Sequence, residues 1–423
     1  MKYLFLFICV GLILSPIVTD CTQKGKTELD RIYPKVMKVA IENPATVERK
    51  DEAVVLNLSE IEVKYKDFNP NAFVVHSDRT ELASQFVQSP DGSEYDQIIF
   101  ISDFSPNVRK TITIRYANSG SITREYTQRT QAEISQKVGG YFKERKYQGG
   151  TFQNVEFLRV PPEHTDHSLF IRYEGPGWES EKIGYRFYLD WRNATDIFGK
   201  KVNAMVLQNV GQDGFDSYHE MSDWGMDILK VGESLGIGSI SMWYEESAKR
   251  VSVTDSITCE IVASGPVYSQ IRTKYFGWKI GDKRYDLTSD LSITAGSRLT
   301  KHELLIGDSP PSLCTGIVKL PETKLFQKTG NKGEWAYLAT YGKQSLAEDN
   351  LGMAVLYKQS DVIEVNEDLL NHIVIFKPED GKLEYNFLAA WEKEPGGLTS
   401  EKQFIEYLDQ LIVTLNSPLD VSI

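Results

Sequence analysis

Short runs of β-branched and aromatic residues recur along most of this chain, and this pattern restricts the possible fold more than any other feature. Residues 111–116, for example, alternate apolar and polar side chains as a half-buried strand does. Combinations of Pro, Gly, Asn and Asp interrupt the runs, as at residues 69–71 and 105–107. Many strands with few helices predict an all-β protein whose antiparallel sheets pack face to face.

The 423 residues are long for one small core and predict two modules. Short strands over residues 27–120 predict a small N-terminal β-sandwich. Residues 121–149 are polar without a sustained apolar face and predict a linker with some helix. Longer strands from residue 150 onward predict a large two-sheet antiparallel sandwich over residues 150–423.

One helix is expected near the C-terminus. Ser400 is placed to cap it and Gln403 to complete a capping box. Phe404, Leu408 and Leu411 then recur at helical spacing, so this helix is expected to pack on the large sandwich.

Residues 1–21 have the layout of a secretory signal, with Lys2 before an apolar run that ends at Asp20-Cys21. Cys21 stands where a lipoprotein signal places its lipidated cysteine, although Asp20 replaces the usual small residue. Lipidation at Cys21 and plain cleavage with release are therefore both open. We expect an exported protein, either periplasmic or an outer-membrane lipoprotein of a Gram-negative bacterium, that meets a membrane only through a lipidated N-terminus.

Charge and cysteine content exclude several functions. The formal net charge of −12 disfavours nucleic acid, because neutralising phosphates requires a basic face. No Gly-x-Ser-x-Gly, His-Glu-x-x-His or Cys-x-x-Cys motif is present, so hydrolases of those classes are not expected. Cys259 and Cys314 either form a disulfide or remain as buried thiols.

Aromatic residues gather between residues 164 and 244, where four of the seven tryptophans lie: Trp178, Trp191, Trp224 and Trp243. Planar rings and fixed polar groups are what a sugar site needs. The alternative is that these tryptophans belong to the core of a large sandwich.

His219 is the leading candidate for acid–base chemistry, with Tyr218 and Asp223 beside it. If residues 219–230 were helical, His219, Asp223 and Asp227 would share one face, although Gly225 argues against a helix. A structural histidine is the alternative for His219. His164 and His167 have a spacing that can bind a metal but is also common in polar loops, so no metal site is predicted, and the cofactor is left open.

The same region resembles a bacterial family, the domain of unknown function numbered 4861. The resemblance rests on the residues Tyr185-Arg186, Asp190-Trp191-Arg192-Asn193, Asp196 to Lys201, Tyr218-His219, Asp223 to Gly232, Leu235 to Gly238, Gly265-Pro266-Val267 and Gly277-Trp278, and on Gln85 and Asp91 to Phe100. It implies a β-sandwich of the galactose-mutarotase-like kind. It also implies a place among gene clusters that degrade uronic-acid-rich polysaccharides such as pectins and ulvan.

Three hypotheses follow, with an oligosaccharide as partner in each. In the first, a lyase or dehydratase acts on a uronic acid, with His219 as base, Tyr218 or Tyr244 as acid, and Arg192 and Lys200 holding the carboxylate. Other contacts to the substrate would come from Trp178, Trp224, Trp243 and Asp223.

The second hypothesis is a glycoside hydrolase that pairs Glu174 or Glu179 with Asp223 or Asp227 across a glycosidic bond. The third is a sugar-binding lipoprotein without catalysis. It predicts an open aromatic platform and saccharide binding that leaves the saccharide unchanged.

Overall fold

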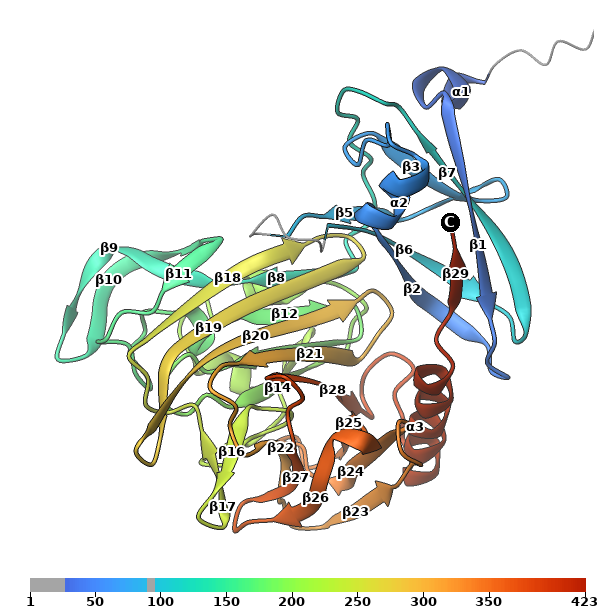
Figure 1. Cartoon of the computed structure of the whole chain (residues 1–423). Coiled ribbons are helices and arrows are strands. Elements are labelled where there is room, and N and C mark those ends of the chain that lie inside the picture. Colours follow the sequence, from blue (N-terminus) through green and yellow to red (C-terminus); the bar gives the residue numbers. More distant parts are fainter. Residues whose placement is uncertain (1–26, 90–95) are drawn as a thin grey trace, which may run out of the picture.

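A computed structural model describes residues 27–89 and 96–423, so the predicted signal and Cys21 lie outside the described residues. Strands dominate these ranges, and the sheets are antiparallel throughout, which confirms the all-β class (Figure 1). No helix in the described part of the chain is long and apolar enough to span a membrane.

The N-terminal module is a small sandwich of two sheets around a core that includes Met37, Ile41 and Phe100. Two short helices accompany it, α1 (Glu28–Ile32) and α2 (Leu58–Lys64). The first sheet contains β1 (Lys35–Asn43), β3 (Phe73–Ser77), β4 (Thr80–Leu82), β7 (Val108–Tyr116) and β29 (Asp420–Ser422). The second contains β2 (Arg49–Asn57), β5 (Ser84–Val87) and β6 (Gln97–Phe104).

The C-terminal strand fastens the two modules together. After the large sandwich the chain returns to the first module, where β29 pairs with β1 and Ser422 lies opposite Ala40. A small apolar cluster spans the contact, with Ile99 from the first module against Val267 from the second. Arg129 adds ion pairs to Asp51 and Glu181, one from each side.

The segment expected to be a linker is largely strand. Residues 121–129 of it lack regular structure, and it then forms β8 (Thr130–Glu133), β9 (Ser135–Lys143) and the start of β10 (Lys146–Asn154). β9 and β10 form a two-stranded ribbon whose side chains are mostly exposed. The ribbon packs only a few aromatic side chains, such as Phe142 and Tyr147, against the core and exposes most of the others, so its sequence lacks the sustained alternation that marks half-buried strands.

The large sandwich has a nine-stranded sheet as one layer. Its strands in spatial order are β11 (Phe157–Arg159), β18 (Ser256–Ser264), β19 (Tyr268–Ile280), β20 (Lys283–Thr294), β21 (Leu299–Ile306), β28 (Lys382–Trp391), β25 (Asn350–Lys358), β24 (Trp335–Lys343) and β23 (Thr323–Lys328).

The second layer is divided into two five-stranded sheets. One contains β15 (Gly225–Asp227), β14 (Thr195–Lys200), β13 (Ile183–Phe187), β12 (Gly177–Ser180) and β8. The other contains β17 (Ser247–Arg250), β16 (Ser241–Tyr244), β22 (Leu313–Val318), β27 (Asn371–Phe376) and β26 (Val362–Glu367). One core joins all three sheets, and it includes Ile197 of β14, Phe376 of β27 and Phe387 of β28. Cys259 and Cys314 are both buried in this module as free thiols.

The predicted C-terminal helix is α3 (Glu401–Asn416), and it packs on the outer face of the nine-stranded sheet. Ser400 caps it by accepting a hydrogen bond from the backbone N–H of Gln403. Phe404 is fully buried over Gly352 of β25, where a Cβ would lie only 2.5 Å from the Phe404 ring. The absence of a side chain at Gly352 therefore allows the helix to approach the sheet closely.

Phe404→Ala should lower the free energy of unfolding by about 3–5 kcal/mol, because it removes a buried ring and leaves a cavity. Urea unfolding followed by circular dichroism measures this change. Gln410→Ala, on the exposed side of the same helix, is the control and should change stability by about 0.5 kcal/mol or less. Equal stability of the two variants would contradict the packing described for α3.

Candidate functional site

A buried guanidinium is the centre of the polar region between residues 164 and 231. Arg186 lies on β13, and its Nη2 is 2.7 Å from Oδ2 of Asp196 on β14 and 2.7 Å from Oδ2 of Asp227 on β15. All three side chains are nearly inaccessible to water. Because the strands are adjacent in one sheet, the pairing of β13, β14 and β15 sets this geometry.

Aromatic rings surround Arg186. Its guanidinium carbon lies 4.8, 5.3 and 5.0 Å from the ring centroids of Tyr188, Phe198 and Tyr218. Arg186 donates a 2.9 Å hydrogen bond to the Tyr218 hydroxyl, and Tyr188 donates one of 2.8 Å to Asp196. Burial raises the pKa of Tyr218 to about 12 despite the nearby guanidinium, so this phenol stays protonated at neutral pH.

His219 is the exposed member of this group. It ends a short 3₁₀ turn, Ser217–His219, and its side chain is 44% exposed. Its Nε2 lies 3.4 Å from Oδ2 of Asp227, whose side chain is 1% exposed. Burial, followed by the like charge of Asp196, raises the pKa of Asp227, with Arg186 opposing both. His219 is therefore the water-exposed group next to this buried carboxyl group.

Glu174 connects Arg186 to a second arginine. Its Oε1 is 3.0 Å from Nη2 of Arg192, and its Oε2 is 4.0 Å from Nη1 of Arg186. Burial alone would raise the pKa of Glu174, but Arg186 and Arg192 outweigh it and hold the pKa at about 2. Glu174 is thus a carboxylate at all ordinary pH values.

Strained backbone holds Glu174 in place. Tyr173 and Glu174 have φ values of 36° and 68°, in the left-handed region that side chains with a Cβ rarely adopt. His167 and Asn193 also have positive φ, at 54° and 40°. A residue strained in this way lowers the stability of the folded state by about 1–3 kcal/mol, and such residues concentrate at functional sites.

Arg192 is held by three carboxylates. Its Nη1 is 2.9 Å from Oδ1 of Asp166, and it also pairs with Asp190 and Glu174. Its guanidinium carbon lies 3.8 Å from the Tyr188 ring centroid. Asp166 is the accessible partner, with a side chain that is 38% exposed.

The two ends of the site adjoin one short segment. At one end, Nδ1 of His167 is 2.7 Å from Asp166, and the His167 ring lies 4.4 Å from the ring of Phe215. At the other end, His219 faces Asp227. Phe215 and His219 are only four positions apart in sequence, so the Arg192 end and the His219 end are close in space.

Asp166, His167 and Glu174 have donor atoms within 4.8 Å of one another, which is close enough for a metal ion. Arg192, however, already contacts both of these carboxylates, so its positive charge opposes a cation there. His164 is not part of the group. It is buried, its Nδ1 lies 2.8 Å from the Ser168 hydroxyl, and burial lowers its pKa to about 4. The residues therefore do not fit a resident metal.

Residues 41–421 match the family model for the domain of unknown function DUF4861. The chain belongs to the DUF4861 family. This match confirms the resemblance recognised in the sequence.

Two solved structures are similar in fold at low sequence identity. A glycosyl hydrolase family 38 protein from Enterococcus faecalis has a TM-score of 0.44 and 9% identity, covering 92% of this chain and 47% of that chain. An α-mannosidase from Enterococcus faecalis V583 has a TM-score of 0.46 and 10% identity, covering 92% and 46%. The chain spans just under half the length of each. Comparison with curated proteins gave no match.

Two residues expected to bind substrate are instead buried in this DUF4861 protein. Trp178 is 1% exposed, stacks on Tyr185 and donates a 2.9 Å hydrogen bond to Thr300. Lys200 is fully buried with Glu179 as its ion-pair partner. Both residues lie on inner strands, where sandwich packing covers them, so we assign them structural roles.

The other candidates divide between two places. Trp224 packs on Phe198, which also contacts Tyr218, so it lies beside the site, and Asp223 next to it is exposed. Trp243 and Tyr244 lie on β16 of the other five-stranded sheet, where Trp243 packs with the cluster around Leu235 and Cys314. His219, Tyr218, Trp224 and Arg192 therefore lie together around Arg186, whereas Trp243 and Tyr244 lie on β16, in the other five-stranded sheet.

Residues 219–230 do not form the helix that would have placed His219, Asp223 and Asp227 on one face. Gly225 has a φ of 136° and begins β15, which pairs with Lys200 on β14. His219 and Asp227 nevertheless meet, because the chain between them turns back toward the sheet.

Sequence reasoning missed the role of Arg186, although a signal was present. A lone arginine within Ile183–Phe187, a strand that is buried throughout, must have carboxylate partners. It also missed Arg250, whose guanidinium carbon lies 5.2 Å from the ring of Trp191, a side chain that is 42% exposed. Arg250 and Trp191 extend the polar region beyond Arg192.

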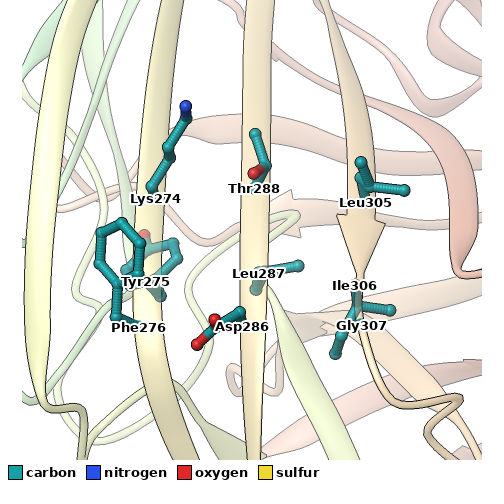
Figure 2. A pocket seen from close by; sticks show the side chains of 9 residues that line it. All are labelled: Lys274, Tyr275, Phe276, Asp286, Leu287, Thr288, Leu305, Ile306 and Gly307. Carbon is teal, nitrogen blue, oxygen red and sulfur yellow. The ribbon is translucent and has the colours of Figure 1, made fainter.

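A shallow depression of about 340 Å³ lies elsewhere, on β19, β20 and β21 of the nine-stranded sheet (Figure 2). Its lining includes Lys274, Phe276, Thr288 and Leu305. Asp286 there accepts a hydrogen bond from the backbone of Gly277. Its lining contains no histidine or carboxylate pair, so the cluster around Arg186 is the better candidate for a functional site.

Glu174→Gln should lower the free energy of unfolding at neutral pH by up to about 3 kcal/mol, at about 1.4 kcal/mol per unit of lowered pKa. Because the folded-state pKa is depressed, the stabilisation is full above about pH 4.5 and declines as the pH falls toward 2. Urea unfolding at several pH values should show the difference from the wild type shrinking between pH 5 and pH 3. Glu220→Gln, at an exposed position, is the control, and a pH-independent difference for Glu174→Gln would contradict the account.

Proposed function

We propose that this protein is a carbohydrate-active enzyme that acts on uronic-acid-containing oligosaccharides by elimination, with His219 as the base. The observation that carries the proposal is the exposed imidazole whose Nε2 faces buried Asp227 at 3.4 Å. This orientation leaves Nδ1 of His219 without a partner among the described residues. An imidazole with a buried carboxyl group near one nitrogen and with its other nitrogen open is suited to general base catalysis.

The proposed step is a proton abstraction beside the uronate carboxylate. Nδ1 of His219 takes the proton from the carbon next to the carboxylate, and the released electron pair forms a carbon–carbon double bond. The neighbouring carbon–oxygen bond breaks, and the departing oxygen receives the proton back from His219. The leaving group is a sugar in a lyase and water in a dehydratase. Tyr218 is buried, so we assign it a positioning role rather than that of the acid.

Arg192 is the proposed partner of the substrate carboxylate. Asp166 occupies its Nη1 at 2.9 Å, and Asp166 is accessible while Asp190 and Glu174 are buried. Burial, opposed by Arg192 and reinforced by the charge of Glu174, raises the pKa of Asp166. Of the three partners, Asp166 is the one that water and substrate can reach. A substrate carboxylate would displace Asp166 and gain a fixed positive charge where the carbanion-like intermediate develops.

His219→Ala should abolish turnover of uronate oligosaccharides and leave the fold intact, because the side chain lies at the surface. Turnover is followed by the ultraviolet absorbance of the unsaturated uronate product, and folding by circular dichroism. The control is Lys332→Ala, an exposed position remote from the site in sequence. Full activity of His219→Ala would exclude His219 as the base.

Asp166→Asn should lower KM for uronate substrates by about three- to tenfold, because it removes the charge that competes for Arg192. The value of kcat should change little, since Asp166 does not touch the reacting carbon in this proposal. Arg192→Lys should raise KM instead. A higher KM for Asp166→Asn would mean that Asp166 holds the site or the substrate in place rather than standing where the substrate carboxylate binds.

A second candidate function, glycoside hydrolysis, is favoured by one observation. Two carboxyl groups near Arg186 have pKa values shifted in opposite directions, Glu174 to about 2 and Asp227 upward. Such a pair is what acid and base roles in a glycosidase require. Both carboxyl groups are buried, however, so hydrolysis requires a movement that opens the site, whereas His219 needs none.

A further inference from the structure

The β9–β10 ribbon projects from the edge of the large sandwich (Figure 1). It carries four basic side chains, Lys137, Lys143, Arg145 and Lys146, and one acidic residue, Glu144. None of these four cations forms an ion pair with any described residue. In a protein with a net charge of −12, this ribbon is a local concentration of unpaired positive charge.

Cross-strand pairing places two of the lysines together. Lys143 lies directly opposite Lys146, and Tyr141 lies opposite Gln148. Alternate residues of a strand share a face, so these four side chains form one exposed surface, which we call the outer face of the ribbon. Like charges directly opposite each other are destabilising, so an anion that binds both lysines would relieve a repulsion.

The outer face also has the groups that bind a sugar ring. Tyr141 is 61% exposed, and its hydroxyl donates a 3.2 Å hydrogen bond to Oε1 of Gln148. An exposed ring offers a surface for the C–H groups of a sugar, and the amide of Gln148 offers hydrogen bonds to hydroxyls.

The opposite face anchors the ribbon to the sandwich. Phe142 and Tyr147 lie 5.0 Å apart, and each is 5.1 Å from the ring of Phe170. At Gly140 a Cβ would lie 2.6 Å from the Tyr147 ring, so only glycine allows that ring to pack there. This packing fixes the direction in which the outer face points.

The ribbon is continuous with the loop that carries Asp166 and His167. The backbone N–H of Tyr147 donates a 2.7 Å hydrogen bond to the carbonyl of Ser168. Arg145 donates one of 3.4 Å to the carbonyl of His164. A polymer bound at the Arg192 end of the site would therefore have the ribbon next to it.

We infer that the outer face of the ribbon, Tyr141, Lys143, Lys146 and Gln148, is a subsite for an acidic segment of a polysaccharide. Its two lysines would bind carboxylate or sulfate groups, and Tyr141 would stack on a sugar ring. This inference rests on the proposed function, because it gives the substrate a second point of attachment outside the catalytic cluster. It also accounts for how a site rich in carboxylates can hold an anionic chain.

The test is affinity electrophoresis of the mature protein in gels containing polygalacturonate, dextran sulfate or neutral dextran. Lys143→Glu/Lys146→Glu should weaken the affinity for at least one anionic polymer by about tenfold. Lys332→Glu/Lys377→Glu, an exposed pair with the same change in net charge, should bind as the wild type does. Retardation by polygalacturonate alone would identify carboxylate as the ligand, and retardation by dextran sulfate would identify sulfate.

Equal binding by the ribbon variant and its control would overturn the inference, as would equal retardation in all three gels. Tyr141→Ala should weaken binding without a change in charge. Because binding is measured without turnover, the two proposals fail separately. If the wild type shows no turnover but the ribbon variant loses polymer binding, only the proposed enzyme is overturned. If the wild type turns over its substrate but the ribbon variant binds the polymers as the control does, only the subsite is overturned.

Discussion

The ion pairs of Arg186 with Asp196 and Asp227 are the interaction on which the polar half of the large sandwich depends. Removing a guanidinium and two carboxylates from water has a large desolvation cost, which is offset only when geometry and hydrogen bonding are nearly complete. Here strands β13, β14 and β15 supply the geometry, and Tyr188 and Tyr218 supply further hydrogen bonds. Loss of any one partner would leave a buried charge uncompensated, so the cluster behaves as a unit.

This cluster determines where chemistry can occur. The charges at its centre are inaccessible, whereas His219 on one side and Asp166 beside Arg192 on the other are accessible to water. Asp227 connects Arg186 to His219, and Glu174 connects Arg186 to Arg192. The cluster as a whole has five carboxyl groups for two arginines, which are Asp166, Glu174, Asp190, Asp196 and Asp227 with Arg186 and Arg192. The proposed anionic substrate would therefore gain from attachment points outside the cluster, such as the proposed ribbon subsite.

Much of the fold was predictable because it depends on local patterns. Alternating strands and frequent turns indicate an all-β chain, and Ser400 marks the start of α3 because capping is a local interaction. The β9–β10 ribbon was not predictable, since a ribbon exposed on much of its surface has the composition of a linker.

The site was predictable only in part. His219, Tyr218, Trp224 and Arg192 gather as expected, because they flank strands of one sheet. Trp178 and Lys200 are residue types that suit a sugar site, but which face of a strand is covered depends on tertiary packing. For the same reason the meeting of His219 with Asp227 follows from strand pairing and not from helical spacing.

The most direct test of the account is product analysis after the purified protein is incubated with pectin- and ulvan-derived oligosaccharides. Ultraviolet absorbance of an unsaturated uronate and product masses are followed together. The account predicts new absorbance, with either fragments whose masses sum to that of the substrate or loss of one water. Fragments that have gained water, with no new absorbance, would contradict elimination and establish hydrolysis instead. Binding of the saccharides without any change in mass would contradict catalysis altogether.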